Sequence, residues 1–270
     1  MKLTKPKNGG RWPILLPPTR NLSWVEEYRR FATTPDLHSL TGRGDNMDRT
    51  KALIDAVLSR VPLGRDDRLI DIGCGDGRFL DIVADKVAFA VGTVPTEEER
   101  ARLASFHKRR PIVFQAGRVE DLRYEGPPFD IITLNGVLQL LGNEARVRRA
   151  LSRIAAIAAP GARLYVGELP QAGLPRKIHN STGRAIIYML RQHGLCASLA
   201  FLRHLWRRRH RFGRYEKPRL QIFSAASDDF VALVTSSGFA LQKTWDTVEV
   251  TGEASDRLAQ RQDYLFVFRR

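Results

Sequence analysis

A glycine-rich stretch in the first half of the chain points most directly to chemistry. It reads DIGCGDG from Asp71 to Gly77, between an apolar run and a helical pattern that begins near Phe79. Glycine tolerates positive φ and has no Cβ, so the backbone of such a turn can approach a ligand closely. A strand followed by this turn and a helix predicts a site for a nucleotide-like ligand at the carboxyl end of the strand.

The spacing of the glycines excludes two common phosphate-binding motifs. The dinucleotide fingerprint GxGxxG requires glycine at position 78, where the chain has Arg78. A P-loop requires Gly-Lys-Ser/Thr after the glycines, and no such sequence follows them. Cys74 and Cys196 are the only cysteines and lack the clustered spacing of a metal site, so neither a disulfide framework nor a bound metal is expected.

The elements around the turn alternate between helix and strand patterns. Apolar residues at helical spacing mark helices at 47–61, 79–84, 96–107 (which starts with three glutamates) and 144–158. Short apolar runs mark strands at 68–72, 87–91, 112–115, 130–134 and 163–166. A last helix, capped by Ser227 and stopped by Gly238, precedes two more strands at 239–247 and 264–268. This alternation predicts an α/β fold with a doubly wound parallel sheet.

Positive charge is concentrated between the fifth strand and the last helix. The chain has a net charge of +15, and residues 172–222 contain 12 Lys and Arg against Glu216 alone. The stretch is far longer than the usual loop of about two to six residues in this position. We therefore expect a basic helical insertion at 172–222. The charge indicates an anionic partner, which charge alone does not identify.

Residues 1–45 lie outside the alternating pattern and are rich in proline and aromatic residues. We expect them to form an N-terminal cap segment over the pocket, followed by one domain at 46–270 that includes the insertion. No apolar run reaches the roughly 18 residues that span a bilayer, and Ile14 to Leu16 is too short for the apolar core of a signal peptide. The sequence thus predicts a cytoplasmic protein, either soluble or peripheral at the membrane surface.

The sequence LIDIGCGDGRFL, which starts at Leu69, resembles the first motif of class I S-adenosylmethionine (SAM) dependent methyltransferases. Further matches follow in that family's order: Phe129-Asp130, Leu134-Asn135-Gly136, Pro160-Gly161 and Gly238-Phe239. The resemblance covers residues 46–168 and 223–270. It implies a Rossmann-like fold with a mostly parallel seven-stranded sheet, an antiparallel last strand and SAM as the cofactor.

The same resemblance implies which residues contact SAM. Gly73 to Gly75 would face the methionine part, and Asp71 would order the turn or reach the amino group through water. Asn135 and Gly136 would line the floor beside that amino group. The full expected set is Asp71, Gly73, Cys74, Gly75, Thr93, Val94, Val119, Glu120, Asn135 and Gly136.

Two positions depart from the family pattern. The family usually has an acidic residue near the end of the second strand to bind the ribose, whereas this chain has Thr93 and Val94. Thr93 could donate one hydrogen bond, which is weaker than a charge-assisted one. The family often has aspartate in the position of Arg118 to meet the adenine amino group. Arginine has no hydrogen-bond acceptor, so we expect Glu120 or the backbone around Val119 to accept the hydrogen bond from the adenine amino group.

SAM carries an activated methyl group, so catalysis would consist of positioning and, where needed, removal of a proton from the acceptor. The catalytic residue is unknown from sequence; the candidates for a base are Glu168, after the fifth strand, and His179, in the insertion.

The segment after Asn135 lacks the D/N/S-P-P-Y/F motif of relatives that methylate nucleobase amines. We expect O-methylation of a hydroxyl on a small or amphipathic acceptor, such as a saccharide, a lipid-linked compound or a secondary metabolite.

The insertion leaves three interpretations open. Apolar residues and Trp206 precede the basic run Arg207 to Arg211, which is typical of an interfacial helix on anionic lipid, so 184–214 is a candidate membrane-surface segment. The same residues could instead form a lid over the pocket. They could also bind RNA, although no RNA-binding module or aromatic stacking platform is present. Alternatives for the whole chain are an RNA methyltransferase and a non-catalytic SAM-fold binding protein.

Overall fold

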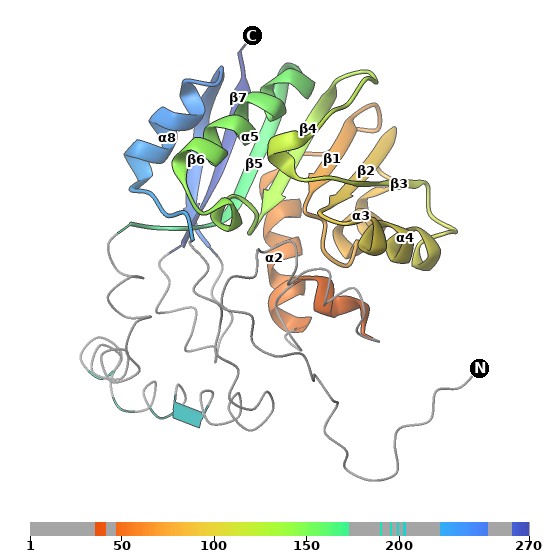
Figure 1. The fold of residues 1–270 in the computed structure, drawn as a ribbon, viewed down its shortest axis with the longest axis horizontal. Helices are drawn as coiled ribbons and strands as arrows, with labels where there is room; N and C mark the ends of the chain where they lie inside the picture. Colours follow the sequence, from red (N-terminus) through yellow and green to blue (C-terminus); the bar gives the residue numbers. More distant parts are fainter. Residues whose placement is uncertain are drawn as a thin grey trace.

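Seven strands form one sheet in the order β3-β2-β1-β4-β5-β7-β6 (Figure 1). The computed structural model describes residues 36–41, 47–172, 222–247 and 261–269, together with positions 190, 195, 199, 202 and 203. The strands are β1 (Arg68–Ile72), β2 (Phe89–Val94), β3 (Ile112–Ala116), β4 (Phe129–Asn135), β5 (Ala158–Pro170), β6 (Phe239–Asp246) and β7 (Arg261–Phe268). The first five are parallel, and β7 runs antiparallel to both β5 and β6. The predicted mostly parallel, seven-stranded sheet with an antiparallel last strand is confirmed.

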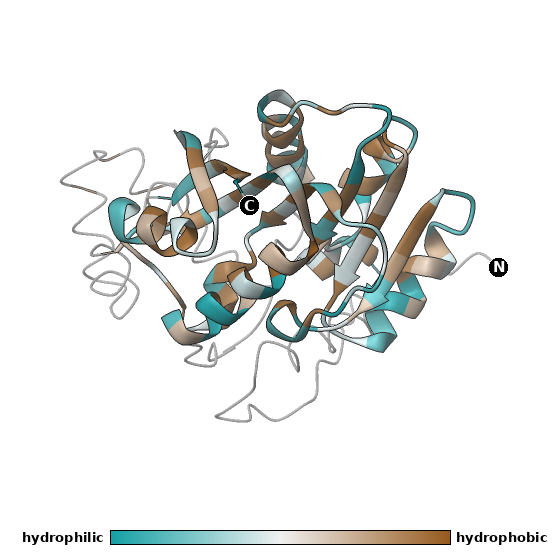
Figure 2. Cartoon of the chain, turned by 90° about the horizontal axis from the view of Figure 1, so that it is seen from above, coloured by the Kyte–Doolittle hydropathy of each residue, from teal (hydrophilic) through white to brown (hydrophobic). Residues whose placement is uncertain are grey.

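Helices cover both faces of this sheet. They are η1 (Leu37–Thr41), α2 (Met47–Arg60), α3 (Arg78–Val83), α4 (Glu97–Phe106), η2 (Val119–Asp121), η3 (Leu138–Leu141), α5 (Glu144–Ile157) and α8 (Ser227–Thr235). Residues of α2, α3 and α4 belong to one buried apolar cluster, and residues of α5 and α8 to another. Successive residues of β1, Leu69 and Ile70, lie in different clusters, so the central strands are buried on both sides. Figure 2 shows these strands as largely hydrophobic.

The helix starts follow local capping chemistry. The Thr96 hydroxyl accepts the Glu99 N–H at 3.3 Å, and the Glu99 carboxylate accepts the Thr96 N–H at 3.0 Å, which forms a capping box at the start of α4. The prediction that Ser227 caps the last helix is wrong. Ala226 is the N-cap and Ser227 is the first helical residue, because the Ser227 hydroxyl lies against that of Tyr264, at 3.3 Å.

The fifth strand begins earlier than its apolar run predicts. It starts at Ala158, although Pro160-Gly161 was expected to separate it from the preceding helix. The register with β4 shifts inside this stretch, since Phe129 pairs with Ala158 but Ile131 pairs with Arg163. The proline and glycine therefore form an irregularity within the strand and do not end it.

One buried carboxylate ties α2, β5 and β7 together. Asp263 is 0% exposed; its Oδ1 accepts the N–H of Glu168 at 2.8 Å and the Thr247 hydroxyl at 2.6 Å. Its Oδ2 accepts the Tyr165 hydroxyl at 2.9 Å and forms an ion pair with Arg60. Burial, followed by the Asp263 charge, raises the pKa of Tyr165, so the phenol stays protonated and donates this bond.

Two long connections leave the described core at one edge of the sheet. The Ala172 N–H donates to the Ala225 carbonyl at 3.0 Å, so both ends of 173–221 lie beyond the carboxyl end of β5. The Thr247 N–H donates to the Arg261 carbonyl at 3.0 Å, and Arg261 pairs with Pro170 of β5. The ends of 248–260 therefore lie at the same edge, where the turn after the parallel strand β1 also opens.

The insertion follows the fifth strand, as predicted, and its five described positions, 190, 195, 199, 202 and 203, are helical. Its remaining residues, including the basic run at 207–211, lie outside the described part of the chain. Within the described part, none of the helices has the length and apolar character needed to cross a membrane.

Candidate functional site

The glycine-rich turn has left-handed backbone at three positions. Gly73, Gly75 and Gly77 have φ values of 73°, 58° and 77°, which glycine adopts without strain. The N–H groups of Gly73 and Cys74 both donate to the Thr93 carbonyl, at 2.9 and 3.0 Å. The Thr93 hydroxyl also lies 3.3 Å from the Gly73 nitrogen. The end of β2 therefore fixes the turn that follows β1.

Side chains from two other segments lie directly over the turn. A Cβ atom added to Gly73 would lie 2.5 Å from Cγ2 of Val137, and one added to Gly75 would lie 3.3 Å from Cγ2 of Thr41. Val137 follows β4, and Thr41 is the last residue of η1. A larger residue at Gly73 would thus collide with the wall of the site and also strain the backbone.

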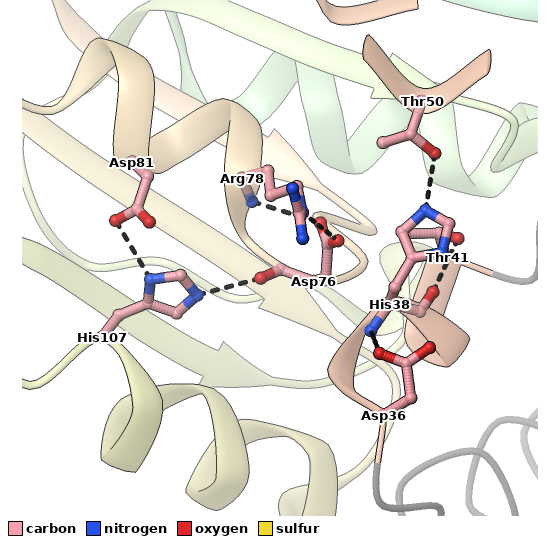
Figure 3. Close-up of polar contacts among 8 residues, drawn as sticks. All are labelled: Asp36, His38, Thr41, Thr50, Asp76, Arg78, Asp81 and His107. Carbon is pink, nitrogen blue, oxygen red and sulfur yellow. Dashed lines mark hydrogen bonds and ion pairs between the residues drawn. The ribbon is translucent and has the colours of Figure 1, made fainter. Parts of the chain in front are cut away.

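Buried polar contacts hold η1 against α2 (Figure 3). Nε2 of His38 lies 2.8 Å from the Thr50 hydroxyl, and the Thr41 hydroxyl donates to the His38 carbonyl at 2.8 Å. The His38 N–H donates to Oδ1 of Asp36 at 3.1 Å. Residues 36–41 of the expected cap segment therefore contact the turn through Thr41. Residues 1–35 and 42–45 lie outside the described part of the chain.

His107 supports the turn from the C-cap of α4, a role that sequence reasoning missed. Its Nε2 donates to the Asp76 carbonyl at 2.9 Å, and its Nδ1 lies 3.0 Å from Oδ1 of Asp81 (Figure 3). A Cβ atom on Gly77 would lie 2.8 Å from Nε2. Nε of Arg78 pairs with Oδ2 of Asp76 at 2.9 Å. A single histidine at a helix end carries no sequence signal for such a contact, 31 residues from its partner.

Two predicted cofactor residues, Asp71 and Cys74, are held inside the core. Oδ1 of Asp71 accepts the Thr133 hydroxyl at 2.7 Å, an arrangement that suits a residue that orders the turn. The Cys74 sulfur lies 2.8 Å from the position of a Cβ atom on Gly92. Burial, followed by the Asp71 and Glu99 charges, raises the pKa of the Cys74 thiol. Cys74 can therefore offer a ligand its backbone but not a thiolate.

The residues expected near the ribose and the adenine lie at the end of β2 and in η2, which follows β3. Val94 and Val119 are buried, and Glu120, in η2, is 4% exposed. Oε1 of Glu120 accepts Nε of Arg146 at 3.1 Å and forms an ion pair with Arg118. The unusual arginine at position 118 is thus explained by a local ion pair with Glu120.

The end of β4 carries an unsatisfied polar atom. Oδ1 of Asn135 is buried and has no hydrogen-bond partner among the described residues. Asn135 pairs with Gly167 of β5, and a Cβ atom on Gly167 would lie only 2.4 Å from this oxygen. Gly136, with a φ of 73°, donates its N–H to the Gly167 carbonyl at 3.0 Å. Gly167 therefore makes room for the Asn135 amide, which sequence reasoning did not anticipate.

Glu168, the candidate base at the end of β5, is held by two arginines. Its Oε1 accepts Nη2 of Arg49 at 2.9 Å and Nη1 of Arg261 at 3.1 Å. Its φ of 59° is the only positive value of a non-glycine residue in the described part of the chain. An oxygen that already accepts two guanidinium hydrogen bonds favours a positioning role over proton abstraction. The other candidate, His179, lies outside the described residues.

The sheet order and the turn after the first strand define a class I Rossmann-like methyltransferase fold. The profile of the methyltransferase domain family matches residues 46–243. The chain therefore belongs to this family, and the resemblance stated from its first motif is confirmed.

Individual relatives match over shorter stretches. A trans-aconitate 2-methyltransferase from Methylobacterium nodulans is 33% identical over 120 residues, which are 44% of this chain and 44% of that protein. A ubiquinone biosynthesis O-methyltransferase from Rhizobium rhizogenes is 33% identical over 105 residues, 38% of this chain and 41% of that protein. The aligned segments thus span less than half the length of these relatives.

Among solved structures, the N-methyltransferase NodS from Bradyrhizobium japonicum, in complex with S-adenosyl-L-homocysteine, has a TM-score of 0.57. Its sequence is 14% identical, and the match covers 91% of this chain and 98% of NodS. A likeness at this level of identity concerns the fold alone.

Proposed function

We propose that this chain transfers a methyl group from SAM to an oxygen atom of a small or amphipathic acceptor. The observation that carries the proposal is the unpartnered Oδ1 of Asn135, two residues before the Val137 side chain that covers the glycine-rich turn. A buried acceptor without a donor is unfavourable. The ammonium group of the methionine part of SAM is a donor that would satisfy it.

The other expected contacts fit the same ligand. Gly73 and Gly75 offer backbone without side chains to the methionine part. The Thr93 hydroxyl accepts from the turn, which leaves its hydrogen for a ribose oxygen. Bound SAM supplies a methyl group on positively charged sulfur. The residues of the chain then have to orient the two reactants and exclude water.

An oxygen acceptor is supported by the names of two relatives. One is an O-methyltransferase of ubiquinone biosynthesis, and the other acts on trans-aconitate, whose carboxylates offer oxygen atoms. The proposed acceptor oxygens also include the hydroxyls of saccharides, lipid-linked compounds and secondary metabolites. Glu168 is given no role as a base, because its Oε1 is bound by Arg49 and Arg261.

Titration calorimetry with SAM and with S-adenosylhomocysteine tests the cofactor assignment. We expect both to bind at one site per chain, and the absence of heat and of competition would contradict the proposal. Turnover is then measured by mass spectrometry of cell-extract metabolites, glycolipids and RNA incubated with isotopically labelled SAM. A label on oxygen of a metabolite or lipid supports the proposal. A label on RNA favours the RNA methyltransferase, and binding without turnover favours a non-catalytic SAM-binding protein.

A second candidate function, attachment to an anionic membrane surface, is favoured by the exposed leucines of the insertion. Leu195, Leu199 and Leu202 are 68%, 57% and 39% exposed and recur at i, i+4 and i+7, the spacing of one helix face. The surrounding residues 172–222 carry 12 of the Lys and Arg residues and one acidic residue. We propose that this face lies in the headgroup region of anionic bilayers.

Co-sedimentation with vesicles of phosphatidylglycerol and of phosphatidylcholine tests this attachment. Binding to the anionic vesicles should be lost in Leu199→Asp and kept in Phe106→Asp, which changes an equally apolar residue, 68% exposed on α4. Equal binding of both variants would exclude the leucine face. RNA binding with a steep salt dependence, without vesicle binding, would favour the nucleic-acid interpretation.

A further inference from the structure

The Arg49–Glu168–Arg261 cluster lies at the carboxyl end of β5, two strands along the sheet from β1 and its glycine-rich turn. Arg49 comes from α2 and Arg261 from the first position of β7, and both bind the same carboxylate oxygen, at 2.9 and 3.1 Å. The side chains are 10%, 4% and 27% exposed for Arg49, Glu168 and Arg261. Three segments far apart in the sequence thus bring two guanidinium groups together at one point of this edge.

Arg261 has an unused hydrogen-bond donor. Nη1 is bound by Glu168, but Nε is buried and has no partner among the described residues. Guanidinium presents its N–H groups in a rigid planar fork, and a carboxylate or phosphate fits such a fork with two parallel hydrogen bonds. An anion would therefore satisfy a donor that the described residues leave open.

The position of this donor relative to the turn is set by strand pairing. Across the sheet edge, β1 carries the turn, β4 ends at Asn135, and Asn135 pairs with Gly167 of β5. Glu168 follows Gly167, and Pro170 of β5 pairs with Arg261. Arg261, in β7, therefore lies one strand beyond the pair Asn135 and Gly167. In the strand order, β7 lies on the other side of β1 from β2 and β3.

Two further features at the carboxyl ends of the strands point to a binding site for a ligand. The Glu168 backbone has a φ of 59°, a conformation that is unfavourable for glutamate and that the bond from its N–H to Asp263 maintains. Oε1 of Gln139, in η3, is also buried and has no partner among the described residues, and the Gln139 carbonyl accepts the N–H of Phe223 at 2.9 Å. Unsatisfied polar atoms thus recur along the strand ends.

We propose that Arg261 binds an anionic group, a carboxylate or a phosphate, on the methyl acceptor. The inference rests on the proposed function, because it assigns this edge to the acceptor of the same reaction. Glu168 is a positioning residue that holds the guanidinium of Arg261 through Nη1, and Arg49 positions the Glu168 carboxylate. The acceptor would then carry an acidic group that anchors it, separate from the oxygen that receives the methyl group.

Calorimetry with citrate and with inorganic phosphate, on the full chain saturated with S-adenosylhomocysteine, tests the proposal. We expect the wild type to bind at least one of the two anions, and Arg261→Gln to weaken that binding at least about tenfold. Arg261→Lys keeps the charge but loses the fork, so it should also weaken binding. Arg148→Gln removes an equal charge from an exposed pair with Glu144 and should bind like the wild type.

The outcomes separate this inference from the proposed function. If the wild type does not bind S-adenosylhomocysteine, the proposed function itself is contradicted. Normal S-adenosylhomocysteine binding with no anion binding, or with unchanged anion affinity in both Arg261 variants, would overturn the inference alone. Equal losses in Arg148→Gln would also overturn it, because the effect would then be one of net charge. Preference for citrate indicates a carboxylate acceptor, and preference for phosphate indicates a phosphorylated one.

Discussion

Gly73 is expected to contact SAM, and its backbone conformation also requires glycine. Gly73→Asp places a side chain at a φ of 73° and 2.5 Å from Val137, and adds a charge beside the expected carboxylate of SAM. We expect the affinity for SAM, measured by calorimetry, to fall at least about 100-fold, or roughly 3 kcal/mol. Gly161→Asp is the matched control, since Gly161 has a φ of 79° and open space around it.

Both variants should unfold cooperatively in a thermal melt. Unchanged SAM affinity in Gly73→Asp would move the cofactor away from the turn. Equal losses in both variants would attribute the effect to backbone strain in general.

Cys74 offers a prediction about reactivity. Because burial raises the pKa of its thiol, little thiolate forms at pH 8, and the reactive species is the thiolate. In a Cys196→Ser background, iodoacetamide should leave the native protein unlabelled at pH 8 and label it completely in urea, as followed by mass spectrometry. Rapid native labelling would contradict the buried placement of the sulfur.

Single residues were predictable where their type is required by backbone geometry. Gly73, Gly75 and Gly77 could be singled out because left-handed backbone after a strand demands glycine. His107 and Arg261 could not, because their contacts are with residues distant in sequence and depend on the assembled sheet. Gly167 was missed for a different reason: it is needed only for the space that the Asn135 amide occupies.

At the level of elements, the pairing of β4 with β5 determines how the Asn135 amide is held. Gly167→Ala places a Cβ atom 2.4 Å from Oδ1 of Asn135 and 2.9 Å from Cε1 of Tyr165. We expect the amide to be displaced and SAM affinity to fall about tenfold, or roughly 1.4 kcal/mol. In an Asn135→Ala background the same substitution should have no further effect on affinity. Additive losses in the double variant would argue against a coupling between the two residues.

The strands and the α-helices of the described residues were predictable in order because their signals are local, whereas the 3-10 helices η1, η2 and η3 were not predicted. The capping box of Thr96 and Glu99 and the apolar strands need only neighbouring residues. Boundaries were less predictable: Ser227 is not the N-cap of α8, β5 and β7 start earlier than their apolar runs predict, and β2 lies at 89–94 instead of 87–91. Tyr264 lies beside the Ser227 hydroxyl, and pairing with β4 continues through Pro160-Gly161.

At the scale of the whole molecule, Asp263 joins distant parts of the chain. Asp263→Ala would leave Arg60, Tyr165 and the Glu168 N–H without their buried acceptor. We expect the free energy of unfolding in urea to fall by about 3–5 kcal/mol. Glu144→Ala, which breaks an exposed pair with Arg148, should cost less than about 1 kcal/mol. Similar losses in the two variants would contradict a central role for Asp263.

The doubly wound parallel sheet followed from the alternation of elements, and its antiparallel last strand followed from the family resemblance. The residues that meet at the carboxyl ends of its strands followed from neither. Three segments that are far apart in the sequence begin or end near the glycine-rich turn and the end of β5: η1, 173–221 and 248–260. Their separation along the chain gives no sign of this proximity. The register of β7 on β5, with Arg261 opposite Pro170, places the end of 248–260 there.

The residues that flank the stretch 173–221 are joined by two hydrogen bonds, from the Ala172 N–H to the Ala225 carbonyl and from the Ala225 N–H to the Pro170 carbonyl. The entropy of closing such a loop grows only with the logarithm of its length, so exchanging this stretch for another of different size disturbs the core little. We therefore expect a chimera that carries a stretch of different length between Ala172 and Ile222 to keep the sheet and the glycine-rich turn.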